Sequence, residues 1–527
     1  MEHLILNRAK RMLRAVYTRV SWGVPLVQTL KFMLHRTKAL VSGSISNWRA
    51  ITYLSQRRFN EVALATSLAP NALNRLNNLP EIDISVVSFN SEKWVKAFFD
   101  SLSAQSYPIG KLHVTIVDHG STDGTLNEIK TITRNMGSNF AGFKLIQQPN
   151  LGFGAGHHRA IRESANEYCL VVNFDIEFLS DAILNAVQTA LSDQFGEVAS
   201  WEFRQVPYEH PKYYDPVTLE TNWSAHACVL IRRSSYEDVG GYDERIFMYA
   251  EDVELSYRFR SFGYALKYVP SATVCHYTYE AAHQVKPVQY VGSCMGNMYV
   301  RLRYGNLANR LAAPILFGLL LLRKEPFQGA RKLLLQNFGK VIRNYAHFRV
   351  GKGKGKGKVF FPFNRFDYGL RRDGAFYKQN KCLSSFPKVS VIIRTYNGRG
   401  FLLKQALMSV FHQTYWNIEV VVVEDGGDTQ KEVVNALSAR MPDNISLQFI
   451  AASHEGRSAA GNVGLGAATG QYLMFLDDDD LLFADHIETL VEALSTSHQY
   501  VAAYSLAWEV LTNINYEEQT YEEVSLA

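Results

Sequence analysis

The sequence predicts an α/β protein in which two domains, each built on a mostly parallel sheet, follow a basic helical N-terminal extension. Three observations lead to this prediction. Short apolar or β-branched segments alternate with stretches of helical periodicity, which is typical of strands and helices that alternate along a parallel sheet. Three strand motifs that end in polar residues occur twice along the chain. A Gly–Lys repeat lies between the two sets.

The Gly–Lys repeat defines the domain organisation. Residues 351–358 read GKGKGKGK, and because such a run cannot bury apolar side chains, we expect a flexible charged linker. The predicted segments are a basic helical extension (1–80), a complete domain (81–300), a helical tail (301–350), the basic linker (351–387) and a partial domain (388–527).

The net charge of +5 conceals a strong asymmetry. Residues 1–60 carry eleven Lys or Arg and one acid, and residues 310–380 carry sixteen Lys or Arg and three acids. Such basic segments either pack as helices with a solvated charged face or contact an anionic membrane surface, and the sequence leaves both open. No nucleic-acid recognition motif accompanies the charge, so we expect no nucleic-acid partner.

The apolar run and the cysteines bear on the compartment. Residues 311–322 form the longest apolar run; as a helix it would span about 18 Å, short of a hydrocarbon core of about 30 Å, so we expect a buried or interfacial helix. The five cysteines are scattered without a Cys-x-x-Cys, which argues against a disulfide framework and suits a reducing compartment. The N-terminus lacks a secretory signal pattern. We expect a cytoplasmic protein, either free or peripheral at the inner face of the plasma membrane.

The strand motifs of the two domains match one another. Residues 82–90 (IDISVVSFN) resemble residues 388–397 (KVSVIIRTYN). Residues 112–125 (LHVTIVDHGSTDGT) resemble residues 418–429 (IEVVVVEDGGDT), and YCLVVNFDIEF is similarly matched by YLMFLDDDDLL. A lone Asp at a strand end often only caps the next helix. Three marked strand ends that occur twice indicate a ligand site beyond the carboxyl ends of the strands.

The polar residues at these strand ends are Asn90, Asp118 and Asp175 in the first domain and Asn397, Asp425 and Asp479 in the second. The interval between the first two is 28 residues in both domains. Acids at strand ends, without a Gly-x-Gly-x-x-Gly or a Walker-type lysine, do not make a dinucleotide or P-loop site. Such a site needs a divalent cation to hold a phosphorylated ligand, and oxygen ligands suit Mg²⁺ or Mn²⁺.

Together the motifs resemble family 2 glycosyltransferases of the GT-A fold. The first domain carries SFN, VDHGSTDGT, NLGFGAG, NFD and GGYDERIFMYAEDVELSYR, and the second carries RTYN, SVFHQTYWNIEVVVVEDGGDT and GNVGLGAATGQYLMFLDDDD. The resemblance implies inverting transfer of a sugar from a nucleotide-diphosphate donor, UDP- or dTDP-linked. The Asn-x-Asp of the first domain is similar to that of rhamnosyl- and galactofuranosyltransferase-like members.

The resemblance also implies roles for individual residues. Those expected to contact the donor are Asn90, Asp118, Asn173, Asp175, Asn397, Asp425 and Asp477. Those expected to hold the metal are Asp175 and His276 in the first domain and Asp477 and Asp479 in the second.

The catalytic base and the acceptor side belong to the first domain in this interpretation. In MYAEDVELSYR, Asp252 matches the usual base, with Glu251 beside it. The alternative is that these acids form a solvated first helical turn favoured by the helix dipole. Trp223, in TNWSAHACVLIRR, is expected near the acceptor sugar. The equivalent base of the second domain would fall beyond residue 527, so we expect that domain to lack its acceptor half.

The expected function is transfer of a hexose, 6-deoxyhexose or furanose to a hydroxyl of a growing, lipid-linked glycan of bacterial surface type. One alternative is a bifunctional glycan polymerase, if the sequence is part of a longer protein. Another is that the second domain is a non-catalytic scaffold that binds a nucleotide sugar.

Overall fold

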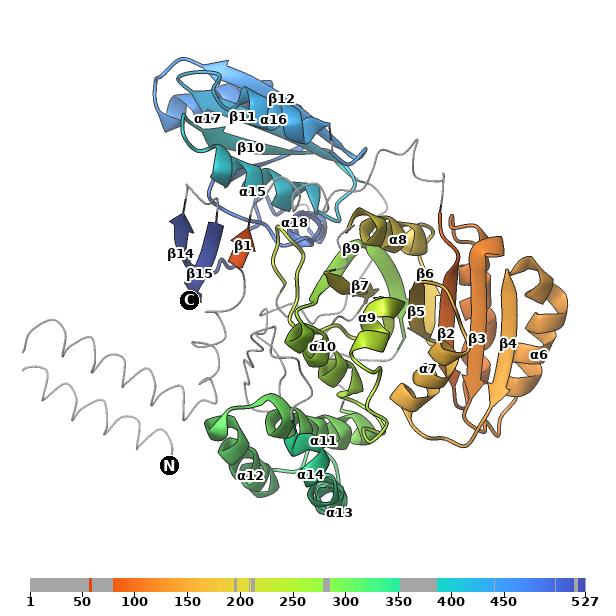
Figure 1. Cartoon of the computed structure of the whole chain (residues 1–527). Helices are drawn as coiled ribbons and strands as arrows, with labels where there is room; N and C mark the ends of the chain where they lie inside the picture. Colours follow the sequence, from red (N-terminus) through yellow and green to blue (C-terminus); the bar gives the residue numbers. More distant parts are fainter. Residues whose placement is uncertain are drawn as a thin grey trace, which may run out of the picture.

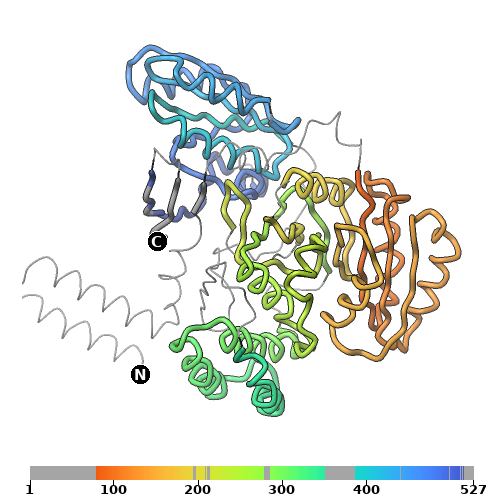
Figure 2. Tube along the Cα trace, viewed as in Figure 1, coloured from red at the N-terminus to blue at the C-terminus, as the bar shows by residue number. Residues whose placement is uncertain are grey.

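The structure is a computed structural model. It describes residues 56–58, 79–193, 197–207, 209, 214–277, 285–350, 386–439, 441–497, 499–515 and 520–526. The predicted basic extension and the Gly–Lys linker lie almost entirely outside these residues, and the predicted domain limits stay predictions. Figure 2 follows the chain from the first sheet, orange to green, to the second sheet in blue.

The first body is built on an eight-stranded sheet with the order β4-β3-β2-β5-β8-β7-β9-β6 (Figure 1). Its strands are β2 (Ile82–Ser88), β3 (Leu112–Asp118), β4 (Gly142–Gln147), β5 (Tyr168–Asn173), β6 (Ile176–Phe178), β7 (Val198–Val206), β8 (Cys228–Arg232) and β9 (Ala265–His276). The pairs β2–β3, β2–β5, β3–β4 and β7–β9 are parallel. Strand β8 is antiparallel to both β5 and β7, and β6 is antiparallel to β9.

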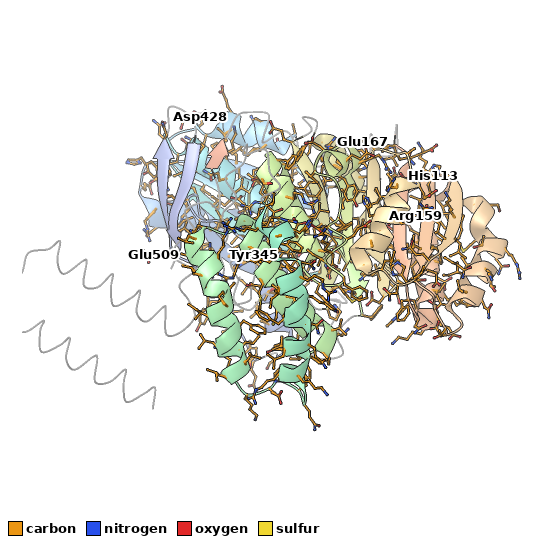
Figure 3. All side chains as sticks on the ribbon, turned by 60° about the horizontal axis from the view of Figure 1, so that its bottom comes forward. His113, Arg159, Glu167, Tyr345, Asp428 and Glu509 are labelled. Atoms are coloured by element: carbon orange, nitrogen blue, oxygen red, sulfur yellow. The ribbon has the colours of Figure 1, made fainter. Side chains whose placement is uncertain are left out.

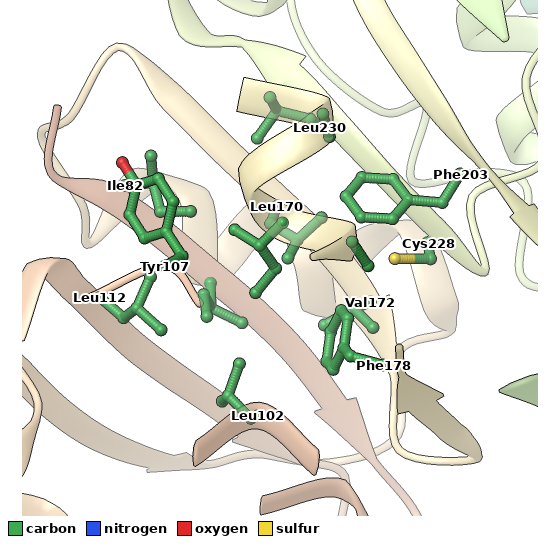
Figure 4. Packing of buried hydrophobic residues seen from close by; sticks show 14 of the residues in the cluster. Ile82, Leu102, Tyr107, Leu112, Leu170, Val172, Phe178, Phe203, Cys228 and Leu230 are labelled. Carbon is green, nitrogen blue, oxygen red and sulfur yellow. The ribbon is translucent and has the colours of Figure 1, made fainter. Parts of the chain in front are cut away.

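Helices cover both faces of this sheet. They are α5 (Glu92–Ser103), α6 (Thr125–Met136), α7 (Phe153–Arg162), α8 (Ala182–Ser192), α9 (Arg233–Asp238) and α10 (Glu251–Phe262), with 3-10 turns η3 (Ile109–Lys111) and η4 (Gly137–Asn139). The apolar faces of the strands and of α5 and α8 form one core, in which Leu170, Phe203 and Tyr107 are almost fully buried (Figure 4). Burial of such side chains contributes roughly 1.5–3 kcal/mol each, which explains why the β-branched strand sequences lie here.

Four helices follow the first sheet and pack on one another. They are α11 (Pro287–Tyr304), α12 (Leu307–Leu322), α13 (Ala330–Arg343) and α14 (Tyr345–Arg349). Their shared core includes Met298, Phe317 and Phe348. Within the described residues, no helix is both long and apolar enough to cross a membrane.

The second body has a four-stranded, fully parallel sheet with the order β12-β11-β10-β13. Its strands are β10 (Val389–Thr395), β11 (Ile418–Asp425), β12 (Ile445–Ala452) and β13 (Tyr472–Asp477), and its helices are α15 (Gly400–Phe411), α16 (Lys431–Ser438), α17 (Arg457–Ala467) and α18 (His486–Ser495). A separate small sheet joins β1 (Gln56–Arg58), β15 (Thr520–Leu526) and β14 (Val510–Asn515). The predicted α/β class with two parallel-stranded bodies is confirmed.

The two bodies contact one another through the segment between β7 and β8. Tyr214 accepts a hydrogen bond from the backbone N–H of Ala484 over 2.9 Å. Arg204, at the end of β7, forms an ion pair of 2.9 Å with Glu488 of α18. Val217 lies in the apolar core of the second body. These contacts are largely buried, so the second body packs directly against the segment that precedes Trp223.

Candidate active site

The strand register brings three predicted residues to one edge of the first sheet. Parallel pairing places Ser88 beside Asp118 and Val87 beside Asn173. Asn90 follows β2 directly and adopts a left-handed conformation with φ of +52°. The carboxyl ends of β2, β3 and β5 therefore meet at the edge where ligands bind in open α/β sheets.

Asp118 organises the loop after β3. Its carboxylate is fully buried and accepts hydrogen bonds from the Ser88 hydroxyl (2.6 Å) and from the backbone N–H groups of Gly120 and Ser121 (3.1 and 3.0 Å). Asn90 stabilises the same loop, since its side-chain oxygen accepts from the Thr122 N–H over 2.8 Å. In this geometry Asp118 shapes the donor-side loop from within, and a direct contact of Asp118 with the donor stays a prediction.

A glycine joins this edge to the loop that precedes α10. Gly152 has φ of +100°, and a Cβ atom added to it would lie 2.1 Å from the carbonyl oxygen of Phe247. The neighbouring Phe153 N–H donates to that same oxygen over 3.0 Å. A side chain cannot be placed between the two loops, so the motif NLGFGAG requires glycine here for close backbone approach.

The β5–β6 turn and the end of β9 bring Asp175 and His276 together. Antiparallel pairing of β6 with β9 places Ile176 opposite His276, and the Tyr277 N–H donates to the Asp175 carbonyl over 3.0 Å. The Nε2 atom of His276 lies 3.5 Å from a carboxylate oxygen of Asp175. Asn173 ends β5 two residues before Asp175. Residues a hundred positions apart thus lie close together, and their role as metal ligands stays a prediction.

Gln205 was not found by sequence reasoning. Its side-chain oxygen lies 2.7 Å from Nδ1 of His276, where it can accept a hydrogen bond from an Nδ1–H tautomer, while Nε2 lies toward Asp175. A histidine that ligates a metal is usually held in this way, with its other ring nitrogen donating to a fixed acceptor. The signal in the sequence is weak, because Gln205 reaches His276 only through the parallel pairing of β7 with β9.

The helix α10 begins with an unusual backbone. Tyr249 and Ala250 both have positive φ, +67° and +74°, a conformation that costs non-glycine residues about 1–3 kcal/mol and is common at functional sites. The turn is held from outside by α11, where a Cβ on Gly292 would lie 2.4 Å from the Met248 carbonyl oxygen. The turn therefore fixes the direction in which the first residues of α10 project.

The two carboxyl groups at the start of α10 lie in different environments. Glu251 is buried, and one of its oxygens has no hydrogen-bond partner. Burial, and then the charge of Asp252, raise the pKa of Glu251 well above its ordinary value. Asp252 is partly exposed, and one of its oxygens accepts from the Val253 N–H over 2.8 Å. Asp252 is therefore the accessible carboxyl group of the pair.

Trp223 packs against the same turn. Its side chain, 9% exposed, lies in a cluster with Ala250, Val253 and Tyr257. The next residue, Ser224, donates its backbone N–H to the Ser256 hydroxyl over 3.1 Å. The predicted acceptor-side segment thus runs along α10, within one turn of Asp252.

A buried ionic network fixes α10 to α11. The Arg303 guanidinium bridges Glu254 of α10 and Asp243 of the preceding loop, and Glu254 also pairs with Arg258. His347 of α14 contacts Asp243 over 2.7 Å. Burial would raise the pKa of Asp243, but the charge of Arg303 and the hydrogen bond with His347 outweigh it and hold that pKa below its ordinary value. Sequence reasoning missed these residues, because the charges come from four separate elements.

In the second body the strand register shows that the predicted match of Asp425 with Asp118 is wrong by one residue. Val389 pairs with Ile418 as Ile82 pairs with Leu112, so Glu424 occupies the position of Asp118. Glu424 is fully buried and, like Asp118, accepts from the loop that follows, through the Gln430 N–H over 2.8 Å.

Asp425 is the next residue and lies at the end of β11, where it accepts from the N–H groups of Glu455 and Gly456 over 3.0 and 3.2 Å. Asn397 follows β10 as Asn90 follows β2. The donor contacts predicted for both residues stay predictions.

Three of the four consecutive acids of the second body are paired with two arginines. Arg394 forms an ion pair with Asp477, and Arg399 forms ion pairs with Asp478 and Asp479. Asp478 is buried and also accepts from the Thr395 hydroxyl over 2.7 Å. Burial, and then the charges of the neighbouring acids, raise the pKa of Asp480. The register places Arg394 where the first body has Val87, so the first body has no arginine at this position.

Comparison with known proteins decides the family. The sequence model of Glycosyl transferase family 2 matches residues 83–253 and 390–520, more than half of the chain. The chain belongs to this family. Membership of a glycosyltransferase family agrees with the predicted enzyme class, and the expected GT-A fold class is consistent with both α/β bodies of the chain.

The chain is similar to several curated glycosyltransferases. An uncharacterised glycosyltransferase of Nostoc sp. is 40% identical over 111 residues, which are 21% of this chain and 34% of the relative. The N-acetylglucosaminyl-diphospho-decaprenol L-rhamnosyltransferase of Mycobacterium tuberculosis is 27% identical over 244 residues, 37% of this chain and 76% of the relative. The chain spans less than half the length of the first curated relatives.

One similar solved structure is the mannosyltransferase PcManGT from Pyrobaculum calidifontis in complex with GDP-Man and Mn²⁺. It is 16% identical, with a TM-score of 0.40, and the similarity covers 60% of this chain and 93% of that chain.

The residues of the first glycosyltransferase body fit a divalent cation. Within the part of the chain that the structure describes, no group of three or more His, Cys, Asp or Glu side chains could enclose a metal. Mg²⁺, however, characteristically takes one or two protein ligands and fills its shell with water and substrate phosphates. Asp175 and His276, the latter oriented by Gln205, supply such an incomplete donor set.

The residues of the second body fit a cation less well. Asp477 and Asp479, the two predicted ligands, are each ion-paired, and Asp479 shares the Arg399 guanidinium with Asp478. A cation there would compete with both guanidinium groups, and the predicted ligand role of these two residues stays a prediction.

The described part of the second body corresponds to the first half of the first body. Leu473 and Phe475 on β13 are 51% and 47% exposed, whereas their counterparts on β5, Cys169 and Val171, are buried beneath α9 and α10. Strand β13 ends the sheet order, whereas β5 continues into β8, β7 and β9. Within the described residues the second body therefore has no counterpart of the helix that carries Asp252.

Proposed function

We propose that the first body, residues 81–300, is the catalytic domain of an inverting glycosyltransferase that acts on a nucleotide-diphosphate sugar, UDP- or dTDP-linked. The observation that carries the proposal is the pairing of Asp175 with His276, whose Nδ1 is held by Gln205. This pair lies beyond the strand ends of the one sheet that also carries α10. The second body has neither a His276 equivalent nor an α10 among its described residues.

The proposed chemistry follows from the different environments of the two carboxyl groups of α10, Glu251 being buried and Asp252 partly exposed. The acceptor hydroxyl gives its proton to Asp252 while its oxygen attacks the anomeric carbon from the face opposite the leaving diphosphate. The bond from that carbon to the diphosphate oxygen breaks with inversion. A divalent cation bound by Asp175 and His276 would offset the charge that develops on the diphosphate.

Glu251 has a supporting role in this proposal. Burial and the charge of Asp252 raise its pKa, which favours a neutral Glu251 carboxyl group and limits the negative charge beside Asp252. The proposal thus gives the α10 acids a role beyond that of a solvated first turn.

We further propose that the acceptor is a hydroxyl of a growing, lipid-linked glycan, and that Trp223 lies beside the acceptor sugar. The support is the packing of Trp223 on Ala250 and Val253, directly next to Asp252. Under this proposal the enzyme works in the cytoplasm, where nucleotide sugars are available. The test described next is designed to identify the transferred sugar as a hexose, a 6-deoxyhexose or a furanose.

The test is a screen of nucleotide sugars against the purified full chain with Mn²⁺ or Mg²⁺, reading both donor hydrolysis and transfer to glycan acceptors. We expect one donor to be consumed, with inversion at the anomeric carbon. Asp252→Asn should abolish transfer and spare donor binding. Retention of configuration, or unchanged turnover by Asp252→Asn, would contradict the proposal.

For the second body we favour a role as a scaffold. Its α18 and the loop before it contact Arg204 and Tyr214 in the segment that leads to Trp223, while the arginines on its acids leave little reason to expect catalysis. Asp175→Ala and Asp479→Ala separate the possibilities. Loss of turnover with the first and not the second supports a scaffold, whereas loss of a distinct second transfer with Asp479→Ala supports a bifunctional polymerase.

A further inference from the structure

The helix α12 exposes an apolar stripe. Leu307, Leu311, Ile315 and Leu319 follow one another at intervals of four residues, which places them on one helix face, and they are 72%, 59%, 64% and 52% exposed. The opposite face, with Ala313, Phe317 and Leu320, packs into the core shared with α11 and α13. The exposed apolar side chains of this stripe therefore lie outside the packed core of the helical tail.

The surface around this stripe is strongly basic. Residues 307–350 contain eight Lys or Arg and a single acid, Glu325. Those that are exposed are Arg323, Lys324, Arg331, Lys332, Lys340, Arg343 and Arg349. The helix α13 adds three exposed apolar residues, Leu333, Leu335 and Ile342. An apolar stripe bordered by cations, with almost no anions, is complementary to a surface that offers hydrocarbon beneath negative charge.

The helical tail projects away from both sheets, as Figure 3 shows for the elements that lead to Tyr345. The sixteen residues of α12 would extend about 24 Å, and no described helix meets the criteria for a membrane span. A helix of this kind lies in the plane of the interface, with its apolar face among the acyl chains.

We propose that the exposed face of α12, with the basic residues of α13, docks the enzyme on an anionic lipid surface. The face is bound firmly to the catalytic helix, because Arg303 of α11 pairs with Glu254 of α10. Docking therefore sets the position of α10 relative to the lipid. That a lipid-linked acceptor is presented to Asp252 in this way rests on the proposed function, whereas lipid binding itself does not.

The test is co-sedimentation of the full chain with vesicles of phosphatidylcholine, with and without phosphatidylglycerol. The variant is Leu311→Gln, Ile315→Gln, Leu319→Gln. The control changes three apolar residues of the second body that are still more exposed, Val501→Gln, Tyr504→Gln and Leu506→Gln. Circular dichroism and thermal melting establish that both variants are folded. We expect the α12 variant to bind anionic vesicles at least about tenfold more weakly and the control to bind as wild type.

Salt separates apolar insertion of this stripe from charge attraction by the basic residues of 1–60. Screening at high ionic strength weakens charge attraction but leaves apolar insertion. We expect wild type to keep residual binding in high salt that the α12 variant loses. Equal binding of wild type and α12 variant at every salt concentration would overturn the proposal. So would a wild-type dimer that the α12 variant converts to monomer without changing vesicle binding, since a second copy would then cover the stripe.

Discussion

The backbone N–H of Phe153 donates a hydrogen bond of 3.0 Å to the carbonyl oxygen of Phe247. Phe153 begins α7, on the donor side of the sheet, and Phe247 lies four residues before α10, which carries the proposed base. This contact joins the two halves of the candidate active site through the backbone. It is available because residue 152 is a glycine with φ of +100°.

Gly152→Ala should therefore destabilise the first body and abolish transfer. Alanine at positive φ costs about 1 kcal/mol or more, and here its Cβ would also lie 2.1 Å from the Phe247 oxygen, so the loops must separate. Gly240→Ala is the control, because Gly240 has φ of +83° with no atom within 4 Å of an added Cβ. Urea unfolding and transfer assays measure both. Similar losses for the two variants would show that close approach is unimportant.

Asp252→Asn and Glu251→Gln should behave differently. Removing a general base lowers kcat about 10²–10⁴-fold, so Asp252→Asn should lose transfer and keep donor affinity. Glu251→Gln replaces a buried carboxyl group whose pKa is raised by a neutral group of the same shape, and most activity should remain. The measurements are steady-state kinetics and donor titration. If Glu251→Gln were as inactive as Asp252→Asn, Glu251 would have to be ionised in the working enzyme.

Metal dependence should map to the first body. Chelation should stop transfer, and Gln205→Ala should weaken the apparent Mn²⁺ affinity about 10–100-fold, the usual effect of losing a residue that orients a ligand. Its control is Gln448→Ala on β12 of the second body, far from His276 in the fold. Titration of donor binding with Mn²⁺ gives a reading independent of turnover. An unchanged Mn²⁺ affinity in Gln205→Ala would contradict the ligand role of His276.

Much of this site could be predicted from the sequence. Strand alternation and the polar strand ends located Asn90, Asp118 and Asp175, because parallel strands bring their carboxyl ends to one edge. The equal interval of 28 residues shifted the predicted match by one position, because Leu112 pairs with Ile82, 30 residues before it, whereas Ile418 pairs with Val389, 29 residues before it. The register of strand pairing decides which residues correspond, and periodicity does not reveal it.

The arginines on the acidic run show a second limit. FLDDDD indicates a metal site when its neighbours are unknown, but Arg394 and Arg399 come from β10 and from the start of α15, about 80 residues earlier. Gln205 and Arg303 likewise act through long-range pairing and left no local pattern. Charge balance in a site is a property of the fold, and composition along the chain does not report it.

The ionic network beneath α10 gives a stability prediction with a defined pH range. Burial raises the pKa values of Asp243 and Glu254, but the arginines paired with them outweigh it and lower both. A carboxyl group with a lowered pKa in the folded state contributes stability above its unfolded pKa of about 4. That contribution is lost as the pH falls from about 5 toward the folded pKa values.

Arg303→Met should therefore lower the free energy of unfolding by about 3–5 kcal/mol near neutral pH, because it leaves two buried carboxylates without their shared cation. The effect should shrink as the pH falls below about 4, where those carboxylates become protonated in the variant at little further cost. Arg343→Met, on the exposed face of α13, is the matched control and should change stability by less than about 0.5 kcal/mol. Urea unfolding monitored at several pH values measures both variants. An Arg303→Met effect that is constant with pH would mean that the guanidinium contributes by packing alone, and the carboxylates would then have no part in fixing α10 to α11.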